Sequence, residues 1–319
     1  MKRGPIAGYL TLAGLLAAVW VIQIFAVPWS DPYVIGVLTL IGIRLVEVVG
    51  LSLVLGFTGQ FSLGHAGFMA VGAYVAGYLN LHMGVPPLPA TILGAFAAAV
   101  AGLIVGLPSL RLTGDYLAVV TLGFNGIIVV ILRNTAAVGG ALGMTNLPQW
   151  TNFGWTFSWL LIGGYFIRNL LVSSHGRLFM AVRDNEIALR SLGVDTTRVK
   201  VTAFVIAAFW AGIAGGLFAF LNASISPNSF GYEQSIEILA MVVLGGTGSL
   251  SGPLLAGAIL TALPEFLRGM EQYRMVIYSG LLIVMMILRP QGLMGNREVS
   301  TVLARGWAWI VARRQRVAT

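Results

Sequence analysis

The segment GFTGQFSLGHAGF, residues Gly56–Phe68, brings hydrogen-bonding side chains and four glycines together between two long apolar runs. Gln60, Ser62 and His65 offer donors and acceptors, and the glycines let other groups approach the backbone closely. If the flanking runs span a membrane, irregular backbone between them must lie against protein or a water-filled cavity. We therefore predict that this segment lines or gates a cavity. Tight helix packing is the alternative for each single glycine, and His65 alone is more typical of a structural histidine.

A second glycine-rich segment, Gly245–Gly252 (GGTGSLSG), interrupts the apolar pattern late in the chain. LGFTGQFSLG from Leu55 aligns with LGGTGSLSGP from Leu244 in a shared L-G-x-T-G frame, although so short a match also arises by chance. Repeated glycine-interrupted segments point to a midplane pathway in transporters. We predict that both segments flank a translocation path.

Two charged residues, Arg44 and Glu47, lie inside an apolar run at an i, i+3 spacing, one above the other on a helix face. Charges at such a depth are costly and usually face the interior of a bundle. They indicate either the wall of a polar pathway or an internally neutralised pair that faces a neighbouring subunit. We favour the second interpretation.

The composition shows what solvent surrounds these segments. Of 319 residues, 57% are hydrophobic and only 9% are charged, whereas a soluble domain carries about 25% charged residues. We predict an all-α, polytopic membrane protein surrounded by lipid. The net charge of +8 is explained by basic cytoplasmic loops, not by nucleic-acid binding. The absence of cysteine excludes disulfides, thiolate metal sites and thiol nucleophiles.

Apolar runs of about 20 residues are expected to span the membrane. The candidates are Tyr9–Val27, Tyr33–Leu55, Ala66–Met83, Ala90–Leu107, Tyr116–Leu132, Thr156–Val172, Val201–Leu221, the shorter Ile236–Leu244 and Pro253–Leu267, and Val276–Leu288. This predicts eight to ten spans, depending on whether the glycine-rich piece is re-entrant. We expect residues 1–30 to be a retained first span, 31–295 the main transmembrane domain, and 296–319 a basic cytoplasmic tail.

The basic residues fix the orientation, because short cytoplasmic loops carry an excess of Lys and Arg. With the N-terminus inside, 14 of the 19 are cytoplasmic: Lys2, Arg3, Arg111, Arg177, Arg183, Arg190, Arg198, Lys200, Arg289, Arg297, Arg305, Arg313, Arg314 and Arg316. We therefore expect both termini in the cytoplasm. The basic tail with Trp307 and Trp309 predicts either an interfacial helix on anionic lipid or a disordered segment.

The long polar loop at residues 173–200 falls on the cytoplasmic side. Asp184 is predicted to cap a short helix with Glu186 in its first turn that ends at Gly193. Apolar residues occur at helical spacing, namely Leu178, Phe179 and Val182, then Ile187 and Leu192. An exposed apolar stripe here indicates a docked partner protein. A helix lying on the membrane surface is the alternative.

The sequence holds no phosphate-binding G-x-x-x-x-G-K-[ST] motif, zinc-binding H-E-x-x-H motif, metal-ligand cluster or G-x-S-x-G elbow. We therefore expect no enzyme activity, no metal and no cofactor. Energy for transport must come from a partner or from an ion gradient. The chain is thus either a permease subunit of an ATP-driven importer or a self-contained secondary transporter or channel. The polar loop and the lack of further intramembrane carboxylates favour the first.

Five separated blocks resemble the permeases of branched-chain amino acid ABC importers. They are GFTGQFSLGHAGFMAVGAY, GDYLAVVTLGF, SSHGRLFMAVRDNEIALRSLGVDTTRVKVTAF, SPNSFGYEQSIEILAMVVLGGTGSLSGPLLAGA and RPQGLMG, which occur in this order from about Gly50 to Gly295. More narrowly, they are similar to the M-type subunit of the leucine/isoleucine/valine system. The resemblance implies a bacterial inner-membrane permease that pairs with a second permease subunit, two cytoplasmic ATPases and a periplasmic binding protein. It implies branched-chain or other hydrophobic amino acids as substrates, with urea, amides or other small solutes as alternatives.

Residue by residue, the resemblance implies two path signatures and one ATPase-coupling segment. The signatures are Gly59, Gln60, Ser62, Gly64 and His65, and Gly245, Gly246, Gly248 and Ser249. The coupling residues are Arg183, Asp184, Glu186, Ile187, Arg190, Leu192 and Gly193. The spacing from Glu186-Ile187-Ala188 to Gly193 is one residue longer than in the EAA motif of other importers. The Arg44/Glu47 pair also departs from the family pattern.

Overall fold

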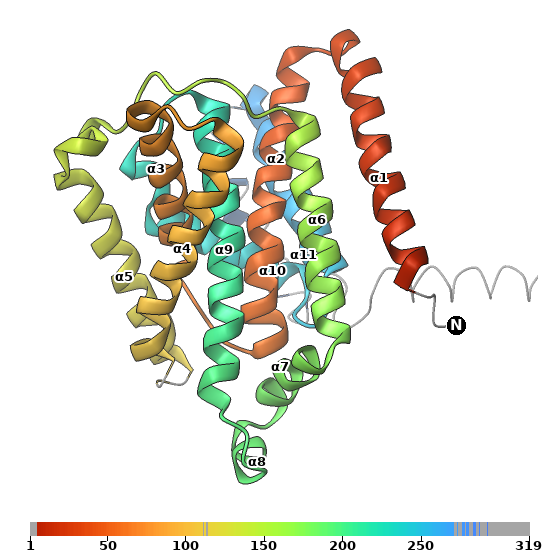
Figure 1. Cartoon of the computed structure of the whole chain (residues 1–319), viewed down its shortest axis with the longest axis vertical. Helices are drawn as coiled ribbons and strands as arrows, with labels where there is room; N and C mark the ends of the chain where they lie inside the picture. The colour runs from red at the N-terminus through yellow and green to blue at the C-terminus, as the bar shows by residue number, and fades with distance from the viewer. Residues whose placement is uncertain are drawn as a thin grey trace, which may run out of the picture.

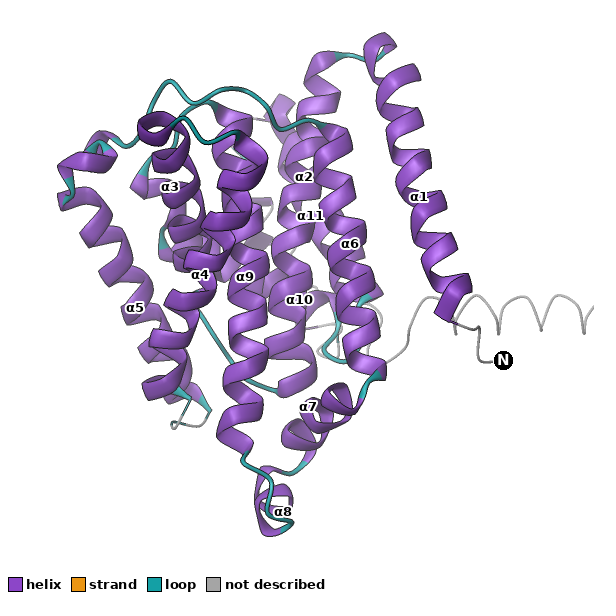
Figure 2. Ribbon diagram, in the orientation of Figure 1, coloured by secondary structure: helices purple, strands orange, loops and turns teal. Residues whose placement is uncertain are grey.

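The computed structural model describes residues 5–110, 112, 114–270, and 273, 276, 277, 279, 280, 283, 284, 287 and 292. The α-helices of this part of the chain are α1 (Pro5–Phe25), α2 (Pro32–Leu51), α3 (His65–Met83), α4 (Pro87–Ser109), α5 (Asp115–Asn134), α6 (Phe153–Val172), α7 (Ser174–Asp184), α8 (Glu186–Ser191), α9 (Thr196–Asn222), α10 (Tyr232–Gly245) and α11 (Ser251–Phe266). Figure 2 shows these helices packed side by side as a bundle and joined by loops.

The bundle has the composition of a membrane protein. Five of its helical segments are long and apolar enough to cross a bilayer: Gly8–Trp29, Pro32–Phe57, Pro87–Ser109, Tyr116–Asn134 and Thr196–Asn222. α3 and α6 have 19 and 20 residues and pack among them. The predicted all-α polytopic fold is therefore confirmed. The figure of eight to ten spans stays a prediction, because six of the thirteen residues of the expected span Val276–Leu288 and the whole tail 296–319 lie outside the described residues.

Three helices, α3, α4 and α9, form the centre of the bundle and pack most extensively on one another. Small residues allow this contact. A Cβ added to Gly212 of α9 would lie 2.6 Å from the Cα of Ala95 on α4, and one added to Gly72 of α3 would meet the backbone of Gly212. Backbone-to-backbone approach of this kind is typical of helix association in membranes.

α1, α7 and α8 lie at the margins of the bundle. α1 stands at one side and packs against α6 (Figure 1), where Trp20 meets Trp155 edge to face with ring centroids 5.3 Å apart. α7 lies at one end of the bundle, beside the first turns of α9, and α8 lies beyond that end (Figure 1). The predicted polar loop is therefore two short helices.

Candidate functional site

The first glycine-rich segment begins where α2 widens into a π-helix, Ser52–Phe57. The backbone N–H of Gln60 donates to the carbonyl of Val54 at 3.0 Å, and the Thr58 hydroxyl donates to the same carbonyl at 2.6 Å. Gly59 has a φ of +68°, in the left-handed region that favours glycine. We call residues 52–58 the wide turn, which ends α2. Residues 59–64, the extended segment, have no regular secondary structure and lead to α3. π-Bulges of this kind are frequent at functional sites.

Four of the five residues of the first predicted signature are buried within this chain. Gln60, Ser62 and His65 have 3% or less of their surface exposed, and a Cβ on Gly64 would lie 2.6 Å from the Thr121 carbonyl on α5. Gly59 is exposed at the surface of the chain. Burial favours a packing role for Gly64. The role of the five signature residues along a transport path stays a prediction.

The second glycine-rich segment lies beside the first. α10 ends at Gly245, and Gly246 and Gly248 have φ values of 108° and 115°, which favour glycine. The backbone N of Gly248 lies 3.6 Å from where a Cβ on Gly56 would stand. Ser249 is buried, and its hydroxyl accepts a hydrogen bond from the Gly252 N–H at 3.2 Å in the first turn of α11. The two segments that share the L-G-x-T-G frame are thus neighbours in space.

The predicted cap of the coupling helix was wrong. Asp184 is the last residue of α7, and its side chain accepts from Arg183 at 3.2 Å. Asn185 caps α8 instead, because its side-chain oxygen accepts from the Ala188 N–H at 2.9 Å. The reason is that Asp184 still belongs to α7, so the residue that precedes α8 is Asn185. α8 ends at Ser191, and Gly193 follows with a φ of 82°.

Glu186 fastens α8 to the first turn of α9. Its carboxylate accepts from Lys200 Nζ at 2.5 Å, from Arg190 Nη2 at 2.6 Å and from the Thr196 hydroxyl at 3.1 Å. Partial burial alone would raise the pKa of the Glu186 carboxyl, but these donors together hold the pKa below its usual value. Lys200 and Thr196 were missed as partners. The signal available was their place in the polar loop, where Thr196 follows Glu186 by 10 residues and Lys200 follows it by 14.

The apolar residues of this segment separate into two groups. Phe179 and Val182 of α7 are buried against the bundle, with 1% and 4% of their surface exposed. Ile187 of α8 and Leu192, just after it, are each 79% exposed. α7 is therefore anchored, while α8 presents two large aliphatic side chains outward.

Arg183 connects the predicted coupling segment to the first glycine-rich segment. Its Nη1 donates to the Gly56 carbonyl at 3.0 Å, and a Cβ on Gly59 would lie 3.0 Å from Arg183 Cγ. A side chain at position 59 would crowd the arginine. Two predicted sites that are more than 120 residues apart in sequence are thus in direct contact.

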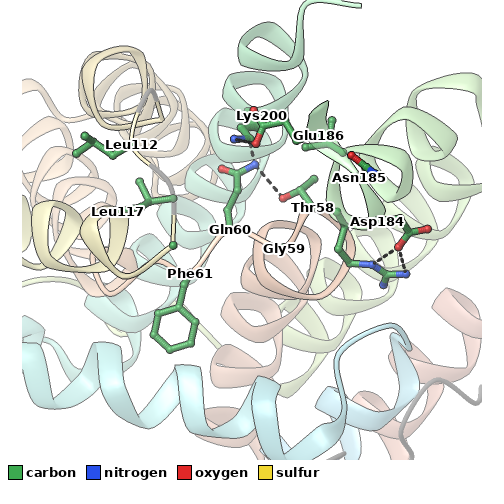
Figure 3. A pocket seen from close by; sticks show the side chains of 13 residues that line it. Thr58, Gly59, Gln60, Phe61, Leu112, Leu117, Asp184, Asn185, Glu186 and Lys200 are labelled. Carbon is green, nitrogen blue, oxygen red and sulfur yellow. Dashed lines mark hydrogen bonds and ion pairs between the residues drawn. The ribbon is translucent and has the colours of Figure 1, made fainter. Parts of the chain in front are cut away.

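A cavity of about 240 Å³ lies at this junction (Figure 3). It is lined by Thr58, Gly59, Gln60, Phe61, Leu112, Gly114, Leu117, Val182, Arg183, Asp184, Asn185, Glu186 and Lys200. The Gln60 amide donates to the Thr58 hydroxyl at 2.9 Å and more weakly to the Lys200 carbonyl at 3.4 Å. The cavity therefore lies between the extended segment, the end of α7 and the start of α9, where a shift of α8 would change its shape.

The intramembrane pair has a third charged member. Arg44 lies 3.9 Å from Glu47 and also 3.9 Å from Glu237 on α10. Glu47 has no exposed surface, so it is buried within this chain and does not itself face a neighbour. Sequence analysis missed Glu237. The available signal was the pair of carboxylates, Glu233 and Glu237, at an i, i+4 spacing in a short apolar helix.

The fold and its buried small-residue core define a multi-pass α-helical membrane protein. Residues 33–288 match the family model described as the permease component of branched-chain amino acid transport systems. The chain belongs to this family. No solved structure gives a significant match.

Two relatives are similar over most of both chains. They are the high-affinity branched-chain amino acid transport system permease proteins LivM of Salmonella typhimurium and Escherichia coli, each 37% identical over 89% of this chain and 76% of its own length. The permease protein LivH of the Escherichia coli high-affinity branched-chain amino acid transport system is 33% identical over 46% of this chain and 47% of its own length.

Proposed function

We propose that this chain is a transmembrane permease subunit of an ATP-driven importer that carries branched-chain or other hydrophobic amino acids. The amino-acid class rests on the family and on the two LivM relatives. The chain has no phosphate-binding motif of its own. In the proposal, two ATPase subunits supply the energy, and a binding protein on the opposite side of the bacterial inner membrane delivers the substrate.

The observation that carries ATP coupling is the exposed α8, which charged side chains attach to the bundle. Ile187 and Leu192 are exposed beyond the end of the bundle, where a groove of a partner can bury them. Glu186 joins α8 to α9, and Arg183 joins the end of α7 to Gly56. A push on α8 would therefore reach α9 through Glu186, and would reach the wide turn of α2 through the adjoining end of α7.

The second permease subunit is proposed to be a homologue of this chain. The partial similarity to LivH supports it, because one transport system in Escherichia coli has permease proteins of both names. We place the α7–α8 end and both termini in the cytoplasm, following the charge bias. A reporter fused after Thr319 should be active in the cytoplasm, and periplasmic activity there would overturn this topology.

The test is transport by the reconstituted importer, with the ATPases, the second permease and the binding protein present. We expect uptake of labelled leucine that needs ATP on the α8 side and persists when ionophores collapse ion gradients. Uptake by this chain alone, driven by a gradient, would establish the secondary transporter instead. Uptake of urea or an amide in place of leucine would support an ATP-driven importer but contradict the proposed amino-acid substrate.

A further inference from the structure

Arg44, Glu47 and Glu237 form a charged cluster halfway along the apolar helices. Arg44 follows Pro32 by twelve residues and precedes Phe57 by thirteen in the 26-residue apolar segment. Its guanidinium lies between the two carboxylates, 3.9 Å from each. Charges at this depth are costly, and those that persist mark polar pathways or contacts.

Two members of the cluster can be reached from outside the chain. The side chains of Arg44 and Glu237 are 16% and 33% exposed, whereas that of Glu47 is wholly buried. With its amide oxygen turned toward Arg44, Gln234 accepts from Nη1 at 2.7 Å and holds the guanidinium in place. The accessible groups are thus one cation and one anion, side by side.

Arg44 and Glu237 are the charged pair of the cluster. Glu47 has no exposed surface, and neither of its carboxyl oxygens has a hydrogen-bond partner among the described residues, so burial favours its neutral form. The accessible Glu237 carboxylate offers a partner for an ammonium group. An accessible guanidinium beside it offers a partner for a carboxylate.

The surface around Glu237 suits an aliphatic group. Ile236 is 46% exposed, and Ala240 and Val243 continue the same outward stripe of α10 at helical spacing. The first turn of α3 packs on the same helix, because the Ala66 N–H donates to the Ser235 hydroxyl of α10 at 3.1 Å. Charged and apolar surfaces therefore adjoin at the middle of the bundle.

Resting on the proposed transport of amino acids, we propose that Arg44 and Glu237 bind the charged head of an α-amino acid while it crosses the membrane. Arg44 pairs with the carboxylate and Glu237 with the ammonium group, and the aliphatic side chain lies along Ile236 and Ala240. The buried Glu47 carboxyl, 3.9 Å from Arg44, holds the guanidinium in position. Both charges of a zwitterion need such partners, because neither is stable unpaired in an apolar region.

The first experiment uses the complete importer in proteoliposomes. Glu237→Gln and Arg44→Gln should each slow leucine uptake about tenfold or more, as expected for the loss of a charged partner. The matched control is Glu233→Gln, which removes a carboxylate four residues earlier on α10 and should keep uptake within about twofold of the wild type. Co-purification of all subunits should be unchanged in every variant, which separates a loss of uptake from a loss of assembly.

A second experiment separates charge from folding. The chain has no cysteine, so Glu237→Cys introduces a single reactive thiol. A negatively charged sulfonatoethyl thiosulfonate should restore part of the uptake lost in this variant, and the positively charged trimethylammonium reagent should not. The wild-type importer treated with each reagent controls for cysteines in the partner subunits.

Three outcomes would overturn the inference. Uptake by Glu237→Gln at the wild-type rate would show that the carboxylate does not contact substrate. Loss of the second permease from the purified complex would show that Glu237 binds a cation of a neighbouring subunit. Equal rescue by both thiol reagents would show that bulk, not charge, is needed. Failure of leucine uptake by the wild type would instead contradict the proposed substrate.

Discussion

The middle of α9 and its first turn are held by opposite means. In the middle, small residues such as Gly212 let α9 touch α3 and α4 backbone to backbone. In the first turn, long charged side chains reach across, and Lys200 pairs with Glu186 of α8. Close packing tolerates no added atom, whereas flexible ion pairs tolerate movement. The comparison indicates a rigid centre and an adjustable end.

The largest expected effect is at the centre. Gly72→Leu should destabilise the protein by at least about 3 kcal/mol, because its side chain has no room against the backbone of Gly212. The control is Gly126→Leu on α5, where an added Cβ meets nothing within 4 Å, so stability should change by less than about 0.5 kcal/mol. Thermal unfolding of both variants in detergent measures the difference. Equal stabilities would contradict a rigid centre.

The next effect is at the adjustable end. Ile187→Asp should weaken association with the ATPase about tenfold to a hundredfold, because burying this side chain contributes about 1.5–3 kcal/mol. Its 79% exposure means that the permease fold itself should be unaffected. Leu142→Asp, at a position outside this segment that is 90% exposed, should keep ATPase binding. Normal co-purification and uptake with Ile187→Asp would show that α8 is not the coupling element.

A smaller effect is expected where the two regions connect. Arg183→Gln should remove the charged hydrogen bond to the Gly56 carbonyl and lower uptake several-fold, while the ATPase stays bound. Arg190→Gln is the comparison, because Arg190 contacts Glu186 and Thr196 but not the wide turn. The ratio of solute transported to ATP hydrolysed is the measurement. An unchanged ratio in Arg183→Gln would mean that motion reaches α2 by another route.

The smallest effect is a pH dependence of the α8 attachment. The folded protein holds the Glu186 pKa below its usual value of 4.5. This contribution is therefore fully present above about pH 4.5 and is lost as the pH falls through the lower, folded-state pKa. The protection of the α8 amides from hydrogen exchange, relative to the intrinsic rate at each pH, should fall in that acidic range. In Glu186→Gln the exchange should already be faster at pH 7 and should lack this step.

The apolar runs predicted the helices well, because the length of an apolar run can be read directly from neighbouring residues in the sequence. The expected spans Ala66–Met83 and Thr156–Val172 lie within α3 and α6 and end where those helices end. The wide turn at Ser52–Phe57 could not be predicted, because that run is apolar and its register depends on Thr58 and Gln60 bonding back to Val54. Tertiary contacts decide such local geometry.

The candidate site was predicted in its parts but not in its connections. Gly56–Phe68, Gly245–Gly252 and the polar loop were each singled out, and the structure brings all three together. Their contacts join residues far apart in sequence, and nothing in a single sequence pairs Arg44 with Glu237. The cap at Asn185 was misplaced because Asp184 and Asn185 are adjacent and both residue types cap helices.

α9 is also longer than the membrane is thick. Its 27 residues rise about 40 Å, against about 30 Å for the hydrocarbon core. If α9 lies near the membrane normal, about 10 Å of it therefore extends beyond the lipid and carries Lys200 near its α8 end. A straight rod held at its centre acts as a lever with two nearly equal arms. A tilt of about 5° would move its two ends by about 2 Å each in opposite directions, closing one face of the bundle as the other opens.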